Sequence, residues 1–224
     1  MYNTAELMKI LQICDSLFPV GAFTLSNGLE TYVQKGIIDS PEDLEEYLDS
    51  YITLLPFNEL GAAALAYCSD ERTLIRLDEI YTAAKAPFEI RSGSQKVTRR
   101  FFKICDSPEH SGAALYKKLI AEGKCFGHQC IAYGLFMKDN SVSLTDGLSV
   151  YGYSICSAIV TNCVKLVPLS QIAGQKILPE TLERISRSVK LASEVCAEEI
   201  GIGGAGFDLR AMQHEKLYSR QYMS

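Results

Sequence analysis

The sequence predicts an all-α protein, a single-domain bundle of about ten helices. Apolar residues recur at three- and four-residue spacing along most of the chain. No segment combines alternating polarity with enrichment in β-branched residues, so no sheet is expected. Helix start and stop signals follow one another closely, without a low-complexity linker or an internal repeat. The 224 residues, 47% hydrophobic and 22% charged, have the composition of a globular domain with a large core.

The first half of the chain predicts helices joined by short connections. Ser40 is an N-cap followed by Pro41 at the first helical position, and Asp70 caps a later helix. Gly36 is expected to stop one helix in a left-handed turn, and Pro56 to end another. The expected helices cover about residues 4–14, 28–35, 41–55, 57–68, 71–84 and 87–104.

The next part of the chain repeats these signals. Ser107 and Pro108 form the same start as Ser40 and Pro41, and Gly123 closes the helix that they begin. A short apolar helix is expected over residues 127–138.

The longest apolar stretch is predicted to be a helix over about residues 144–167, capped by Ser143 and ended by Pro168. A helix that is apolar nearly all round is either central in a protein or crosses a membrane. Asp146, Asn162 and Lys165 within it favour a central core helix, so no membrane role is expected. Two more helices are predicted over residues 169–177 and 179–200.

The chain is expected to divide into a helical domain over residues 1–200 and a hinge with a tail over residues 201–224. Four glycines between Gly201 and Gly206 predict a flexible hinge. The tail from Phe207 to Ser224 carries more apolar and aromatic surface than a solvated tail needs. We expect it to dock on a partner and to be mobile without one. The alternative is that it packs back on its own bundle.

Charge, cysteine usage and motifs exclude several function classes. The net charge of −5 argues against a nucleic-acid binder. No secretory signal is expected, and the cysteines have no disulfide-framework spacing. Five that lie in apolar helical runs are predicted to be reduced and buried in a cytoplasmic protein: Cys14, Cys68, Cys156, Cys163 and Cys196. No nucleophile or phosphate-binding motif is present, so we expect neither an enzyme nor a cofactor.

One segment could hold a metal ion. Cys125, His128 and Cys130 supply thiolate and imidazole groups, which are ligands for zinc or nickel. A helical protein that binds or transfers a metal through these residues is therefore the alternative function. The competing interpretation is buried cysteines and a core or capping histidine.

The stretch from Cys14 to Glu30 is predicted to be an ordered, aromatic-rich loop between two helices. Its apolar residues alternate like those of a half-buried strand, yet Pro19, Gly21 and Gly28 oppose regular structure. Such a loop either carries function or only fills a core edge. The partner-binding residues expected in this stretch are Phe18, Pro19, Gly21, Phe23, Ser26, Gly28 and Glu30.

Lys165 is a second candidate contact residue. Near the end of a helix its charge complements the negative helix end, which is a structural role. The functional alternative is a lysine presented to a charged partner. Gln171 and Gln175 follow one turn apart and share a face.

Three stretches resemble the urease accessory protein UreF. Residues Ser16 to Glu30 are similar to the N-terminal signature of that family, with departures at Phe18 and Ala22. The segment Lys165-Leu-Val-Pro-Leu-Ser-Gln171, continuing to Gln175, resembles a family motif that usually has glycine at position 170. The closing residues Met212 to Ser224 resemble its terminal motif. Arg91 and Ser94 fit its central helix loosely.

The resemblance implies an all-helical, non-enzymatic adaptor of urease maturation. Such proteins bind the accessory protein UreD (UreH in some bacteria), form dimers in that complex and recruit the GTPase UreG, and the assembly delivers nickel to apo-urease. The resemblance places the tail against UreD/UreH and Lys165 where the GTPase is influenced. The partner-binding residues expected in the tail are Arg210, His214, Glu215, Tyr218 and Arg220.

Overall fold

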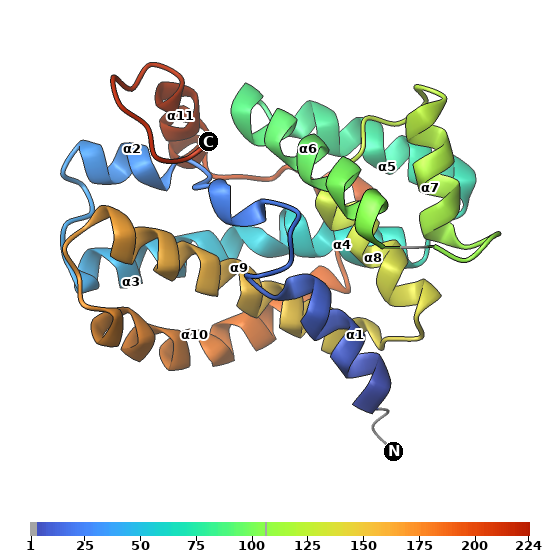
Figure 1. Ribbon diagram of the computed structural model, residues 1–224, viewed down its shortest axis with the longest axis horizontal. Coiled ribbons are helices and arrows are strands. Elements are labelled where there is room, and N and C mark those ends of the chain that lie inside the picture. Colours follow the sequence, from blue (N-terminus) through green and yellow to red (C-terminus); the bar gives the residue numbers. More distant parts are fainter. Residues whose placement is uncertain (1–3, 106) are drawn as a thin grey trace.

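The computed structural model describes residues 4–105 and 107–224, and the prediction of an all-α bundle is confirmed. Those residues form eleven α-helices, three short 3-10 helices and no strand (Figure 1). The α-helices are α1 (Thr4–Cys14), α2 (Leu29–Gln34), α3 (Pro41–Leu54), α4 (Glu59–Tyr67), α5 (Glu71–Ala84), α6 (Phe88–Ile104), α7 (Gly112–Ala121), α8 (Gln129–Asp139), α9 (Leu144–Leu166), α10 (Gln171–Ala192) and α11 (Ala205–His214). The 3-10 helices are η1 (Ala22–Thr24), η2 (Leu55–Phe57) and η3 (Ala197–Glu199).

The long helix α9 lies across the middle of the molecule, as predicted for a core helix. It packs against α1, α2, α3, α4, α8 and α10 (Figure 1). In the described part of the chain, only α9 is long and apolar enough to cross a membrane, and half of its apolar window is buried inside the bundle. Its apolar faces are therefore used for packing between helices.

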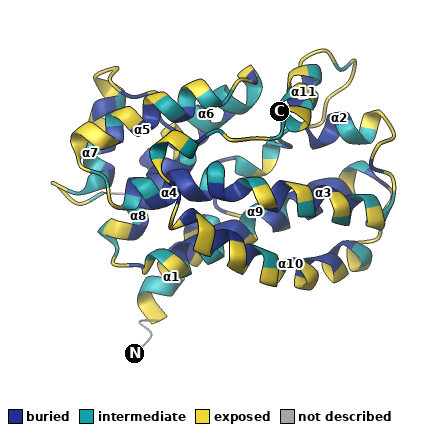
Figure 2. Cartoon of the chain, turned by 180° about the vertical axis from the view of Figure 1, so that it is seen from behind, coloured by how far each residue is buried: buried dark blue, intermediate teal, exposed yellow. Residues whose placement is uncertain are grey.

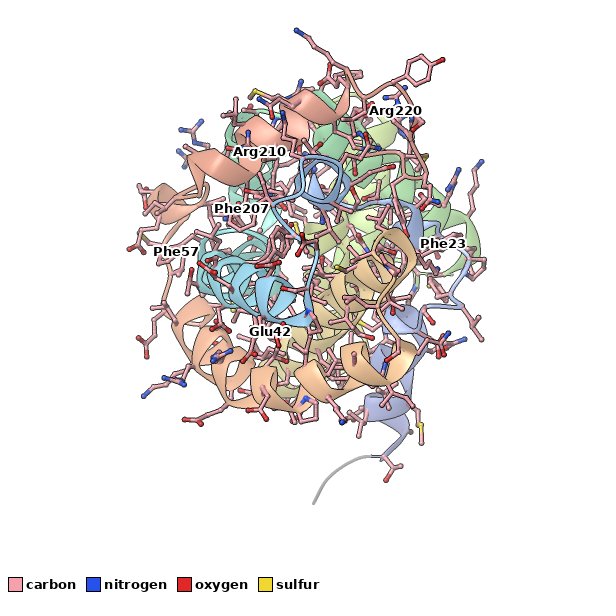
Figure 3. All side chains as sticks on the ribbon, turned by 90° about the vertical axis from the view of Figure 1, so that its left-hand side faces the viewer. Phe23, Glu42, Phe57, Phe207, Arg210 and Arg220 are labelled. Atoms are coloured by element: carbon pink, nitrogen blue, oxygen red, sulfur yellow. The ribbon has the colours of Figure 1, made fainter. Side chains whose placement is uncertain are left out.

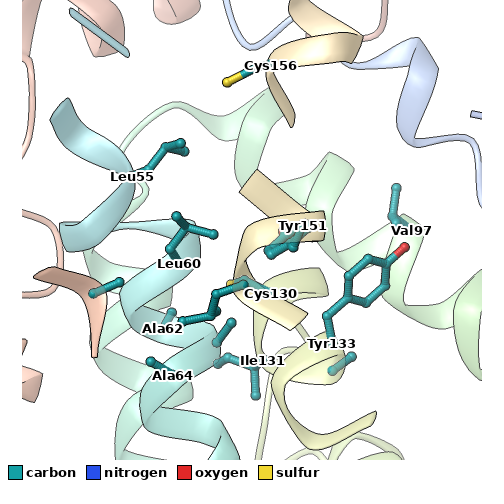
Figure 4. Packing of buried hydrophobic residues seen from close by; sticks show 14 of the residues in the cluster. Leu55, Leu60, Ala62, Ala64, Val97, Cys130, Ile131, Tyr133, Tyr151 and Cys156 are labelled. Atoms are coloured by element: carbon teal, nitrogen blue, oxygen red, sulfur yellow. The ribbon is translucent and has the colours of Figure 1, made fainter. Parts of the chain in front are cut away.

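Helices α4, α8 and α9 pack closely against one another in the core. Gly134 on α8 is required there, because a Cβ atom at this position would lie 2.1 Å from the carbonyl oxygen of Ala63. The small residues of α4 thus bring two helices into close contact. Figure 2 shows the burial concentrated on these helices, and Figure 4 shows Leu60 and Ala62 of α4 facing Cys130 and Tyr151.

Several predicted helix starts are confirmed, but the one at Ser107 is wrong. Ser40 and Asp70 both form capping boxes, as expected. Helix α7 begins at Gly112 instead, after Ser111 as N-cap. The carboxylate of Asp139, at the end of α8, accepts hydrogen bonds from the backbone amides of Gly112 at 2.9 Å and Ala113 at 2.8 Å. A cap supplied by a distant segment overrides the local start signal.

The predicted break at Pro179 is also wrong, because α10 continues through it. Pro179 is exposed, so the hydrogen bond that its ring removes is lost on the solvent side. The opposite side of the helix, including Leu178 and Ile185, stays packed in the core. The helix then ends at Ala192 rather than at Ile200.

The tail packs on its own bundle, and the expectation of a mobile tail is corrected. The backbone amide of Gly201 donates to the carbonyl of Phe57 at 2.8 Å, which fastens the glycine segment. Helix α11 follows, and Phe207 inserts into a cluster with Tyr32, Tyr47 and Tyr51. Burial of this aromatic surface explains why the tail stays attached.

The predicted burial of the cysteines in helical runs is only partly correct. Cys156 and Cys163 are buried and Cys14 is half-buried, but Cys68 and Cys196 are exposed. The two exposed thiols lie beyond the ends of α4 and α10, where no helix covers them.

Candidate functional site

The stretch from Ser16 to Glu30 is an ordered loop whose turns need glycine. Gly21 and Gly28 have φ angles of 79° and 87°, a region that favours glycine. Phe18 is buried against the core, whereas Pro19 and Phe23 are exposed. Phe18 and Val20 thus anchor the loop, whereas Phe23, from the same alternating set, faces solvent.

The end of the chain lies directly on this loop (Figure 1). The amide of Met223 donates to the carbonyl of Thr24 at 2.8 Å, and the amide of Ser26 donates to the carbonyl of Ser224 at 2.7 Å. The Ser26 hydroxyl donates to the same carbonyl. These bonds join two segments from opposite ends of the sequence into one surface.

Glu30 at the start of α2 is the centre of this junction. Its side chain is 2% exposed and accepts hydrogen bonds from the amides of Gln221 at 2.8 Å and Tyr222 at 3.1 Å. The Nε2 atom of His214 lies 3.0 Å from the same carboxylate. A buried carboxylate is tolerated only with such a full set of partners.

His214 connects Glu30 to a second carboxylate. The ring is fully buried, and its Nδ1 atom lies 2.6 Å from Glu89 on α6. Glu89 also accepts from the guanidinium of Arg220 at 2.6 Å. Both carboxylates can accept from the ring only when both of its nitrogens carry protons. We call Glu30, Glu89, His214 and Arg220 the terminal network; Glu89 had no signal in the sequence.

Helix α11 is held against α2 by close packing as well as by charge. A Cβ atom at Gly28 would lie 2.9 Å from the backbone nitrogen of Ala211. The guanidinium of Arg210 lies over the ring of Tyr32, 5.7 Å from its centroid. Figure 3 shows Phe207, Arg210 and Arg220 in this part of the molecule. The inner face of the tail is therefore fixed, while Glu215 and Tyr218 remain exposed.

Lys165, Gln171 and Gln175 lie at the corner between α9 and α10. All three are exposed, and Ile172 beside them is 70% exposed. One turn before Lys165, the buried side-chain amide of Asn162 donates to the carbonyl of Leu25 at 3.1 Å. The end of α9 is therefore tied to the same loop that carries the tail.

The structure does not bring Cys125, His128 and Cys130 together as a metal site. The ring nitrogens of His128 lie 2.8 Å from the Thr82 hydroxyl and 3.3 Å from the Ser94 hydroxyl. Burial raises the pKa of each thiol to about 12. In residues 4–105 and 107–224, no group of three or more His, Cys, Asp or Glu side chains is placed to hold a metal.

Asp78 explains how this segment folds instead. Its buried carboxylate accepts from the Tyr116 hydroxyl at 2.5 Å and from the amides of Phe126 and Gly127 at 2.7 and 3.0 Å. Burial, together with the charges of Lys85 and Arg91, lowers the pKa of His128 to about 3. His128 is thus a neutral core residue, and the metal-binding alternative is not favoured.

The fold and this junction define a class of all-helical protein whose two chain ends meet in one ordered surface. The UreF family model matches residues 38–181. The urease accessory protein UreF of Bacillus sp. (strain TB-90) is 34% identical over 98% of this chain and 99% of its own length. The same-named protein of Haemophilus influenzae (strain PittGG) is 35% identical over 99% of this chain and 97% of its own. The chain belongs to the UreF family of urease accessory proteins.

Proposed function

We propose that this chain is a non-enzymatic adaptor that bridges UreD/UreH and the GTPase UreG during nickel insertion into apo-urease. It acts in the cytoplasm, as a homodimer within that complex. Membership of a urease accessory family supports this role. The observation that carries the proposal is the bond between His214 and Glu30, residues 184 positions apart, which builds one surface from both terminal motifs.

The expected contact residues divide into two sets by burial. The buried set shapes the surface and consists of Phe18, Gly21, Ser26, Gly28, Glu30 and His214. The exposed set is available to UreD/UreH and consists of Pro19, Phe23, Glu215, Tyr218 and Arg220, with Arg210 half-buried beside them. Aromatic and arginine side chains at the centre of a contact carry most of its binding energy. We assign this role to Tyr218, Phe23 and Arg220.

Substitution of Tyr218 tests this assignment. The side chain is fully exposed, so Tyr218→Ser is expected to leave the melting temperature unchanged. The affinity for UreD/UreH falls by about tenfold, because an aromatic anchor is lost. Titration calorimetry measures the affinity, with Tyr153→Ser on α9 as the matched exposed control. Equal affinities of the two variants for UreD/UreH would contradict the assignment of Tyr218 to the contact.

We assign Lys165, Gln171 and Gln175 to the contact with UreG. Lys165 is exposed in the last turn of α9, where its side chain can reach a partner. Lys165→Ala is expected to keep the unfolding free energy within about 0.5 kcal/mol and to change nickel loading of urease. Lys176→Ala, at an exposed position of α10, is the control. Nickel content equal to wild type in the Lys165 variant contradicts the assignment.

A further inference from the structure

A cavity of about 590 Å³ lies between α1, the loop before α2, and α9. Packed protein interiors hold few voids larger than a water molecule. Cavities that bind small molecules usually occupy about 300–1,000 Å³. The hollow therefore has the size of a ligand site, and neither the terminal network nor the exposed rim of the tail lines it.

The walls of the cavity are mainly apolar, and so is its opening to solvent. Leu11, Phe23 and Tyr153 stand at the mouth and are 43%, 51% and 41% exposed. The inner wall consists of Ile13, Val20, Leu25, Tyr133, Tyr151 and Ile159. Removing a hydrocarbon chain from water into such a space is favourable in proportion to the apolar area that is buried.

The polar end of the cavity carries an ion pair with unused bonding capacity. The Nζ atom of Lys85 lies 2.8 Å from Oε1 of Glu59 and 3.1 Å from Oδ1 of Asn58. The Tyr81 hydroxyl donates to the same Glu59 oxygen at 3.3 Å. An ammonium group has three donors, and the third Lys85 N–H has no hydrogen-bond acceptor among the described residues, although Nζ also lies 5.0 Å from the centroid of the Tyr81 ring. Oε2 of Glu59 has no hydrogen-bond partner among residues 4–105 and 107–224.

We propose that this cavity binds a small uncharged amphiphile, a hydrocarbon chain that ends in a hydroxyl or a primary amide. Such a head donates to the free Glu59 oxygen and accepts from the remaining Lys85 proton. A charged head is disfavoured, because the two side chains already neutralise each other and an extra buried charge would lack a counterion. The polar contacts at Glu59 and Lys85 are separate from the proposed adaptor contacts, and Phe23 at the mouth of the cavity belongs to both surfaces.

Titration calorimetry with decanol, decanoate and decylammonium tests the proposal on the full chain. Decanol is expected to bind, and each charged probe to bind at least about tenfold more weakly. Ala158→Trp fills the cavity from α9 and is expected to abolish decanol binding. Ala121→Trp, at the exposed end of α7, is the matched control and is expected to bind decanol as the wild-type chain does.

Each other outcome overturns the proposal. Absence of decanol binding up to its solubility limit removes the site. Tighter binding of a charged probe than of decanol contradicts the head-group assignment, and undiminished decanol binding by Ala158→Trp places the ligand elsewhere. If Ala158→Trp does not fold, Ala22→Leu narrows the same cavity from η1 and gives the same comparison.

Discussion

His214 and His128 are both fully buried histidines, yet they serve opposite purposes. The ring of His214 lies between two carboxylates, Glu30 and Glu89, which come from α2 and α6. The ring of His128 lies between two hydroxyls, those of Thr82 and Ser94. His214 joins segments through its contacts with two carboxylates and has exposed tail residues beside it, whereas His128 completes a neutral core.

This difference shows that the partners of a buried histidine decide its role. Contacts from one ring to two carboxylates hold the two ends of the chain together, and substitution of either carboxylate can break them. Two hydroxyls satisfy a neutral ring, and burial keeps it neutral by lowering the pKa of His128 to about 3. Only the first arrangement produces a surface that depends on both terminal motifs.

The largest expected effect comes from breaking the terminal network at Glu30. Glu30→Ala leaves His214 and two backbone amides without their acceptor. The free energy of unfolding is expected to fall by about 3–5 kcal/mol, as measured by urea denaturation. Glu215→Ala removes an exposed carboxylate of the same tail and should change the free energy of unfolding by less than about 0.5 kcal/mol. Similar losses in the two variants would show that Glu30 does not hold the tail.

The second effect is a dependence of stability on pH at His128. The unfolded chain protonates this histidine below the ordinary histidine pKa of 6.5, whereas the folded chain does not until about pH 3. The unfolded state therefore binds more protons in this range, so stability falls as the pH falls, by about 1.4 kcal/mol per unit from this residue. His128→Asn is expected to flatten the slope between pH 6 and 4 by that amount. An unchanged slope would contradict a neutral His128.

A smaller effect is expected at Gly28, where packing rather than charge holds the tail. Gly28→Ala forces an unfavourable φ and places a Cβ atom against the backbone of Ala211, for a loss of about 2 kcal/mol. Gly36 also has a positive φ, of 64°, but a Cβ atom added there would meet no other atom within 4 Å. Gly36→Ala is therefore expected to cost only about 1 kcal/mol. Thermal unfolding distinguishes the two variants. Equal losses of stability would mean that α11 does not pack closely against Gly28.

The helices were predictable because their signals are local. Ser40, Asp70 and Ser143 cap their helices as the sequence indicates. The errors at Ser107 and Pro179 arise where distant packing overrides a local signal, through the cap from Asp139 and the core contacts of α10.

The site was predictable only in parts. The two terminal motifs were recognisable separately, and their residues are the ones that meet. Their meeting itself, and the contribution of Glu89 from the first turn of α6, depend on tertiary contacts between residues more than a hundred positions apart in sequence. No periodicity or spacing encodes such contacts, and this is also why the tail was expected to be free.

The central claim is that both ends of the chain together form the surface that binds the urease-maturation partners. Size-exclusion chromatography with light scattering, run on the chain with UreD/UreH and UreG, tests it most directly. The control is Glu194→Ala, which removes an exposed carboxylate outside both terminal motifs. We predict one assembly whose mass includes all three proteins, and its loss for Glu30→Ala but not for Glu194→Ala at a temperature where both variants are folded. Elution of the wild-type chain at its own mass in the presence of both partners would contradict the claim.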